Sequence, residues 1–215
     1  MEHHRRLPKD KVEVEDREAA GLWKAIAMSK KIGEGAEKIT LDTILSIHKT
    51  MLGSALPEAA GRFRKDGEDV NKLKCIEPPP GRLVKDRIYV FWKDFDNRLA
   101  VIPRHPKNQT KHQLKKWREN VIDVAAWAQH GFASIHPFCD GNGRMARLLT
   151  NIILRRYGLP PTSVHYEGDN KSQYLKALCQ IDEHRDYDAL KILIIKGIMN
   201  SYKKEAKVRM RKYSE

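Results

Sequence analysis

Twelve residues, HPFCDGNGRMAR at positions 136–147, carry most of the functional information in this sequence. They bring an imidazole, a carboxylate, two glycines around an asparagine, and two arginines into one turn and the start of a helix. These groups can hold a polyphosphate, a metal ion and a proton acceptor in one place. The stretch 136–147, called the motif below, therefore predicts a site for phosphate chemistry.

The second half of the motif predicts an anion site at the N-terminus of a helix. Asn142 stands where an N-cap residue is expected, because a helical pattern begins at Arg144. The first amide groups of such a helix are free, and the helix dipole adds to their attraction for an anion. Gly141 and Gly143 let the backbone approach a phosphate closely. Arg144 and Arg147 share one helix face, from which both guanidinium groups can bind phosphate oxygens.

The first half of the motif supplies groups that can act on a bound phosphate. His136 can accept a proton near neutral pH, and Asp140 is a hard oxygen ligand suited to Mg²⁺. Phe138 is expected to face the core and pin the loop. Each of these residues has an ordinary structural explanation when taken alone. The combination favours attack by a hydroxyl group on a nucleotide phosphate.

The bulk properties of the chain limit its class and its partners. Its 215 residues suffice for one domain with a hydrophobic core, and its net charge of +13 favours acidic partners. No apolar run is long enough to cross a membrane and no signal peptide is visible, so we expect a cytoplasmic protein without a membrane partner. The cysteines form no C-x-x-C pair, which predicts reduced thiols at Cys75, Cys139 and Cys179.

Hydrophobic periodicity predicts a mainly α fold with one β-hairpin. Helical spacing recurs over residues 17–32, 40–52, 113–134, 144–157, 171–184 and from 186 into the C-terminal region. Thr40 is expected to be an N-cap, and the region 53–80 is expected to be a loop because three prolines end it. Aromatic and β-branched residues predict two antiparallel strands at 88–92 and 98–102.

The motif matches the Fic signature, H-P-F-x-D/E-G-N-G-R-x-x-R, at every specified position, and the chain resembles the Fic family over roughly residues 40–200. The resemblance implies a compact helical domain that transfers AMP from ATP to a Ser, Thr or Tyr hydroxyl of a target protein, or of the enzyme itself. It implies that His136 is the base, that Asp140 holds Mg²⁺, and that the nucleotide is bound by Phe138, Gly141, Asn142, Gly143, Arg144 and Arg147.

Members of this family dock their target on a β-hairpin flap beside the site. The predicted hairpin at 88–102 is our candidate, and its docking residues would be Ile88, Tyr89, Val90, Leu99 and Val101. Residues 64–75 are the alternative, with weaker strand character. Main-chain pairing along the flap would bring the target hydroxyl to His136 without reading much of the target sequence.

Many Fic proteins also carry an inhibitory helix with the pattern S/T-x-x-x-E-G/N, whose glutamate pairs with the second motif arginine. Two stretches match it in part, one ending in Glu34 and one, near the C-terminus, ending in Glu205. We favour Glu34, so the sequence predicts a Glu34–Arg147 ion pair that keeps the isolated protein nearly inactive. The resulting division is an N-terminal arm with the inhibitory helix at 1–35, a Fic core at 36–200 and a basic tail at 201–215.

Other interpretations stay open at this point. The same fold can use another nucleotide, transfer phosphate, or remove AMP from a target. A basic nucleic-acid-binding protein or an idle scaffold is the alternative of a different class, although no helix-turn-helix or zinc-finger spacing supports nucleic-acid binding. The sequence determines neither the target protein nor the oligomeric state, and a homodimer is one option.

Overall fold

The computed structural model describes residues 11–68, 70, 75–104, 106–162 and 169–212. Within these ranges the regular secondary structure is helical apart from an isolated bridge residue, Ile76, which confirms the predicted mainly α class. The helices are α1 (Lys11–Glu34), α2 (Leu41–Leu52), α3 (Gly81–Ala100), α4 (Lys111–Ile135), α5 (Asn142–Arg156), α6 (Asp169–His184) and α7 (Asp188–Lys212). None of these helices is long and apolar enough to cross a membrane.

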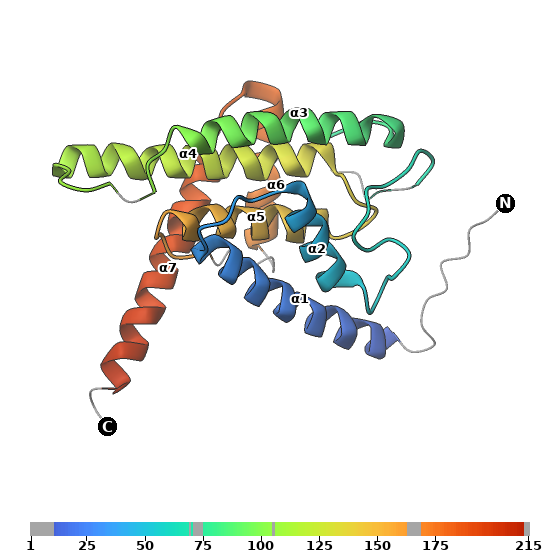
Figure 1. Ribbon diagram of the computed structural model, residues 1–215, viewed down its shortest axis with the longest axis horizontal. Helices are drawn as coiled ribbons and strands as arrows, with labels where there is room; N and C mark the ends of the chain where they lie inside the picture. Colours follow the sequence, from blue (N-terminus) through green and yellow to red (C-terminus); the bar gives the residue numbers. More distant parts are fainter. Residues whose placement is uncertain (1–10, 69, 71–74, 105, 163–168, 213–215) are drawn as a thin grey trace.

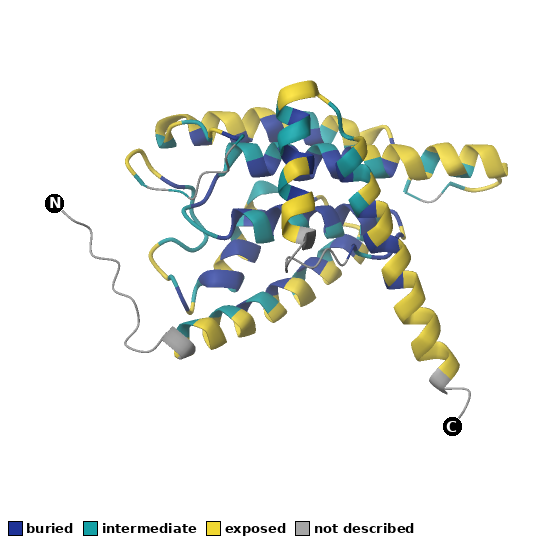
Figure 2. Cartoon of the chain, turned by 180° about the vertical axis from the view of Figure 1, so that it is seen from behind, coloured by how far each residue is buried: buried dark blue, intermediate teal, exposed yellow. Residues whose placement is uncertain are grey.

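Helix α5 lies at the centre of the fold. It packs against α4 on one side and against α1 on the other, while α3 runs along α4 and α2 packs against α1 (Figure 1). Helices α6 and α7 pack against each other, and α7 then projects from the body with a largely exposed surface (Figures 1 and 2). Because α5 is surrounded, nearly all of its apolar side chains are buried. The motif therefore sits at the anchored N-terminal end of a buried helix.

Two threonines fix the starts of helices that flank the site. Thr40 is the N-cap of α2, as predicted: its hydroxyl oxygen accepts a hydrogen bond from the Thr43 amide at 3.2 Å, completing a capping box. Thr110 does the same for α4, where it accepts a bond from the Gln113 amide at 3.2 Å. Helix α4 thus starts slightly before the predicted residue 113 and leads directly into the motif.

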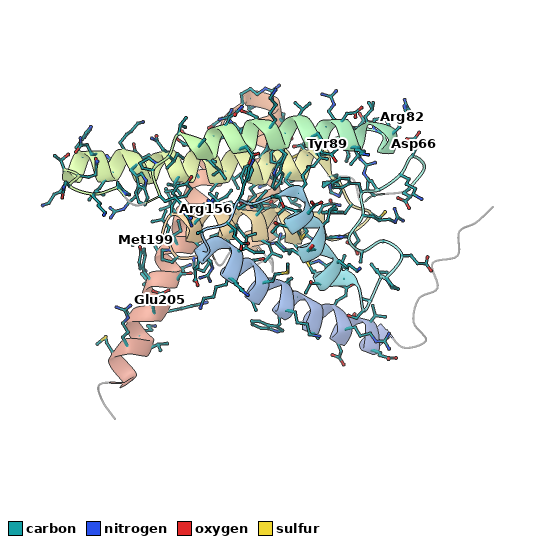
Figure 3. The ribbon with its side chains drawn as sticks, in the orientation of Figure 1. Asp66, Arg82, Tyr89, Arg156, Met199 and Glu205 are labelled. Atoms are coloured by element: carbon teal, nitrogen blue, oxygen red, sulfur yellow. A yellow bond between two sulfur atoms is a disulfide. The ribbon has the colours of Figure 1, made fainter. Side chains whose placement is uncertain are left out.

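The predicted hairpin at 88–102 is wrong, because most of this stretch belongs to α3. Its large apolar residues recur at helical spacing, and the core buries Ile88, Phe91, Trp92 and Phe95. Tyr89 points to solvent (Figure 3), with an exposed fraction of 54%. Val90 is also exposed, at 71%. Burial against α4 outweighs the local preference of aromatic and β-branched residues for strands.

The proposed docking residues therefore form no strand edge. Ile88 is buried in the core, Leu99 is half-buried near the end of α3, and Val101 is exposed just after it. Of the alternative flap at 64–75, residues 69 and 71–74 lie outside the described part of the chain.

A disulfide joins Cys75, in the loop before α3, to Cys179 on α6, with 5.2 Å between their Cα atoms. The prediction of reduced thiols is therefore wrong at these two positions, and Cys139 is the free cysteine of the three. Spacing along the chain did not reveal the pair, because 104 residues separate its members and only the fold brings them together.

Replacing Cys75 and Cys179 by serine is expected to lower the free energy of unfolding by about 3–5 kcal/mol, because the bond restricts a long loop in the unfolded chain. Urea denaturation without reductant would measure this loss. The matched control is Cys139→Ser, which removes the free thiol but no cross-link. Equal stability of the two variants would contradict the expectation.

Candidate functional site

The motif forms the tight connection between α4 and α5. Helix α4 ends at His136, which adopts a left-handed conformation with φ of 51°, and the Gly141 N-cap of α5 has φ of 78°. A left-handed conformation is uncommon for a residue other than glycine and persists only where surrounding contacts hold it. Here the His136 amide still donates to the Phe132 carbonyl at 3.2 Å, so the turn is anchored on α4.

The imidazole of His136 is prepared to accept a proton. Its Nδ1 atom lies 3.1 Å from the Ala133 carbonyl oxygen, which can only accept a hydrogen bond, so Nδ1 carries the hydrogen in the neutral ring. This leaves the lone pair on Nε2. Burial lowers the pKa of His136, and the positive charge of Arg64 lowers it further. The ring is therefore mostly neutral near physiological pH, with Nε2 able to accept a proton.

Arg64 supports the His136 turn and was not among the predicted site residues. Its guanidinium donates from Nε to the His136 carbonyl at 2.7 Å and from Nη2 to the Pro79 carbonyl. Its own amide donates to the Pro137 carbonyl at 2.9 Å. The side chain is buried, so these bonds are shielded from water. An arginine in the predicted loop 53–80 gave no sign of this role, because its two partners in the motif lie more than seventy residues away in sequence.

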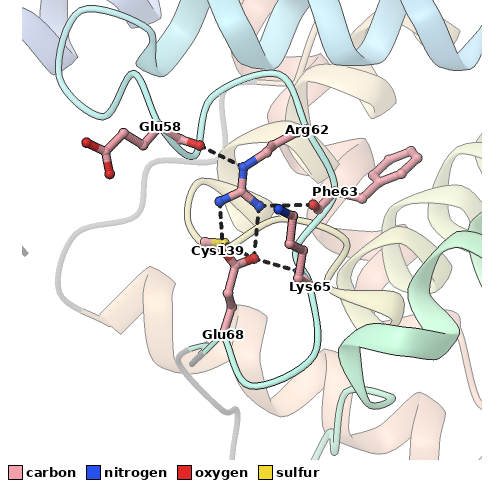
Figure 4. A network of polar contacts seen from close by, with 6 residues as sticks. All are labelled: Glu58, Arg62, Phe63, Lys65, Glu68 and Cys139. Atoms are coloured by element: carbon pink, nitrogen blue, oxygen red, sulfur yellow. Dashed lines mark hydrogen bonds and ion pairs between the residues drawn. The ribbon is translucent and has the colours of Figure 1, made fainter. Parts of the chain in front are cut away.

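A second link joins the same loop to the motif (Figure 4). Arg62 donates two hydrogen bonds to the Glu68 carboxylate, at 2.6 and 2.9 Å, and the Cys139 thiol donates to Glu68 at 3.2 Å. The bonds from Arg62 hold the pKa of Glu68 at about 2. Burial, together with the neighbouring Glu68 carboxylate, raises the pKa of Cys139 to about 11. Cys139 therefore stays protonated as a hydrogen-bond donor and is no nucleophile at neutral pH.

Asn142 closes the loop instead of capping the helix as predicted. Its side-chain oxygen accepts from the Phe138 amide at 2.9 Å, and its side-chain nitrogen donates to the Phe138 carbonyl at 2.7 Å. The N-cap position belongs to Gly141, which has no side chain to cover the first amides of α5. Phe138 is fully buried, in agreement with its predicted role as a pin. The free amides remain available for an anion.

Both predicted arginines lie at this end of α5. Arg147 folds back along the helix, so that a Cβ atom at Gly143 would lie 3.4 Å from its Nη1 atom. Burial lowers the pKa of Arg147 to about 10, which still leaves the group charged at neutral pH. Arg144 is half-buried, and its Nη2 atom lies 3.5 Å from an Asp140 carboxylate oxygen. Two cations beside free helix amides make an environment suited to phosphate oxygens.

Asp140 fits a role as ligand for Mg²⁺ bound together with phosphates. Its carboxylate is partly exposed at the mouth of the site, and one oxygen accepts a hydrogen bond from the Gly141 amide at 2.6 Å. In the described residues no three His, Cys, Asp or Glu side chains are grouped as a metal site. Mg²⁺ does not need such a group, because it commonly takes one or two carboxylates, substrate phosphates and waters.

The predicted inhibitory glutamates lie elsewhere. Glu34, at the end of α1, forms its ion pair with Arg155 at 3.0 Å, about two helical turns beyond Arg147. Glu205 is exposed on the projecting part of α7 (Figure 3). An acidic residue of α1, Glu18, pairs with the motif arginine Arg144 at 2.7 Å. No inhibitory pattern surrounds Glu18, which is why the sequence did not point to it.

Comparison with known proteins agrees with this geometry. A model of the Fic/DOC family matches residues 38–154, more than half of the chain. A protein adenylyltransferase Fic of Nematostella vectensis is 34% identical over 158 residues, which make up 72% of this chain and 32% of the relative.

Two solved structures show the same fold. Fic-1 of C. elegans superposes with a TM-score of 0.64 at 24% identity, over 97% of this chain and 55% of that one. BepC of Bartonella tribocorum, solved with bound AMPPNP, has a TM-score of 0.57 at 18% identity over 88% of both chains.

His136 is expected to titrate below the ordinary histidine pKa of 6.5, because burial disfavours its charged form. At pH 6.5 more than half of the molecules would then carry the neutral ring. NMR titration of the imidazole carbons, assigned with a His136→Ala variant, measures this pKa. A value at or above 6.5 would contradict the proposed effect of burial.

Proposed function

The chain belongs to the Fic/DOC family, and on that premise we propose that it is a protein adenylyltransferase, which moves AMP from ATP to a hydroxyl group of a target protein. The observation that carries the proposal is the neutral His136 base beside the free amides of α5 and the cations Arg144 and Arg147. The chain spans about a quarter to a third of the length of the curated relatives it matches first.

The reaction follows from the positions of these groups. Nε2 of His136 takes the proton from a target hydroxyl, and the hydroxyl oxygen attacks the α-phosphorus of ATP. A bond forms between that oxygen and phosphorus, while the bond from the α-phosphorus to the bridging oxygen breaks and pyrophosphate leaves. The first amides of α5 and both motif arginines hold the phosphate oxygens, whose negative charge they offset.

ATP is the donor that the comparisons favour, because relatives are named adenylyltransferases and BepC was solved with an ATP analogue. Asp140 would hold Mg²⁺ at the mouth of the site, and the ion would supply charge neutralisation of the phosphates. A second candidate, transfer of phosphate or of another nucleotide, keeps the same groups. The mass added to the target separates these outcomes.

We propose that the target is a protein side chain with a hydroxyl group. A Ser, Thr or Tyr hydroxyl fits a histidine base, and modification of the protein's own side chains, a homodimer and a cytoplasmic location stay predictions. Nucleic-acid binding remains disfavoured, since no helix-turn-helix or zinc-finger spacing in the sequence supports it.

Replacing His136 by alanine is expected to lower AMP transfer by about 10²–10⁴-fold, the usual contribution of a general base. The assay is incubation with ATP, Mg²⁺ and a cell lysate, followed by mass spectrometry for added AMP. Running GTP, CTP and UTP in parallel identifies the nucleotide. Transfer that survives unchanged in the variant would refute the role of His136.

Glu18→Ala is expected to raise the affinity for Mg-ATP by about two- to fivefold. The partly exposed Glu18–Arg144 ion pair would then no longer compete with the phosphates for Arg144. The matched control is Glu34→Ala, which breaks an ion pair on the same helix with Arg155. Isothermal titration calorimetry measures both. If only Glu34→Ala increased affinity or transfer, the Glu34 lock predicted from the sequence would be the better description.

A further inference from the structure

His48 lies on the buried face of α2 and contacts the motif in two ways. Its ring stacks on Phe138, with 3.7 Å between the ring centroids and 6° between the planes. Its Nε2 atom lies 3.0 Å from the Asp140 carbonyl oxygen. On its other side, Nδ1 lies 2.9 Å from the Gly61 amide nitrogen. The fully buried ring thus connects the loop after α2 with the motif.

These partners determine where the ring carries its hydrogen. The Gly61 amide can only donate, so Nδ1 must accept. Nε2 then carries the hydrogen and donates it to the Asp140 carbonyl, which can only accept. A single neutral tautomer satisfies both bonds, and this is the form of histidine that bridges a donor on one side and an acceptor on the other.

The bond to Asp140 matters because it holds the peptide unit that leads into α5. The carbonyl of that peptide accepts from His48, and its Gly141 amide donates to the Asp140 carboxylate at 2.6 Å. The peptide is therefore fixed at both ends. Its orientation sets both the position of the Asp140 carboxylate and the direction of the first amides of α5.

Helix α2 also presses directly on this turn. A Cβ atom at Gly141 would lie 2.8 Å from Met51, 3.0 Å from Leu52 and 3.4 Å from Nε2 of His48. The left-handed φ of 78° at Gly141 is thus combined with close contact to α2. Little space remains for the turn to shift while His48 is in place.

We propose that His48 is a positioning residue for the nucleotide site, which acts by holding the Asp140–Gly141 peptide in the orientation that phosphate and Mg²⁺ binding require. It does not act on the substrate, since its two ring nitrogens are both engaged by backbone groups. The role in nucleotide binding rests on the proposed function. The role in ordering the turn does not.

The experiment separates positioning from general stability with a second buried histidine. His130 on α4 is also nearly fully buried, and its Nε2 atom lies 3.2 Å from Asp182 and 3.3 Å from Ser134. Within the part of the chain that the structure describes, none of its hydrogen bonds is to the motif. His48→Phe keeps an aromatic ring against Phe138 and loses both hydrogen bonds, and His130→Phe makes the same chemical change elsewhere.

Hydrogen–deuterium exchange of the nucleotide-free protein gives the primary readout. His48→Phe is expected to raise amide exchange across residues 138–143 about tenfold, the factor that corresponds to one lost buried hydrogen bond. His130→Phe should leave that region unchanged. Should His48→Phe fail to fold, His48→Asn keeps a hydrogen-bonding side chain without the stacked ring and is expected to show a smaller increase. Unchanged exchange in a folded His48 variant would overturn the proposal.

Equilibrium binding of Mg-ADP then tests the link to the nucleotide. His48→Phe is expected to weaken binding about tenfold, and Asn in its place should restore part of it, while His130→Phe binds like the wild type. If the exchange result holds but His48→Phe binds Mg-ADP as tightly as the wild type, the positioning role toward the nucleotide is overturned. If the wild type itself binds no nucleotide, the proposed function fails, whereas the ordering of the turn is still judged by the exchange result.

Discussion

The hydrogen bonds of the buried Arg64 guanidinium hold the site together. They join the carbonyl at the end of α4 to the carbonyl of Pro79 just before α3, while the Arg64 amide holds Pro137. The left-handed conformation at His136 depends on such support, because an unsupported non-glycine residue would leave it. The orientation of the His136 turn is therefore set by a loop that lies some seventy residues earlier in the chain.

Charge at the site is distributed unevenly. Arg64, Arg144 and Arg147 bring three positive groups around one turn, and burial lowers the pKa of Arg64 and of Arg147. A buried cation is costly unless an anion approaches it. Glu18 offsets part of the charge at Arg144. A polyphosphate bound at the start of α5 would offset more of it.

The sequence predicted what depends on local spacing. The α2 cap at Thr40, the helix that follows the motif and the two arginines at one end of it follow from residues a few positions apart. The prediction of a hairpin at 88–102 was wrong because it also rested on local sequence alone. Local strand preference was visible, whereas burial of Phe91 and Phe95 against α4 was decided by the fold.

Contacts between distant segments were out of reach of the sequence. Arg64 stood in a predicted loop, His48 looked like one more member of a buried helix face, and Cys75 and Cys179 share no recognisable spacing. Asn142 does lie at the start of α5. The N-cap position belongs to Gly141, however, and the Asn142 side chain binds the backbone of Phe138 instead. Sequence patterns thus predicted the candidate site residues of the motif and missed most of the groups that hold the motif in place.

The distances along the chain that the site spans affect how it is made. The bonds from His48 to Asp140 and from Arg64 to His136 cross 92 and 72 residues. Contacts between residues so far apart form late in folding, because the chain entropy lost on closing the loop must be met before the contact stabilises the fold. During synthesis, residues 11–135 can emerge from the ribosome before the motif, so His48 and Arg64 then have no motif residues to bind. A nascent chain therefore has no working site until α5 has been translated, however much of the preceding helical structure is already formed.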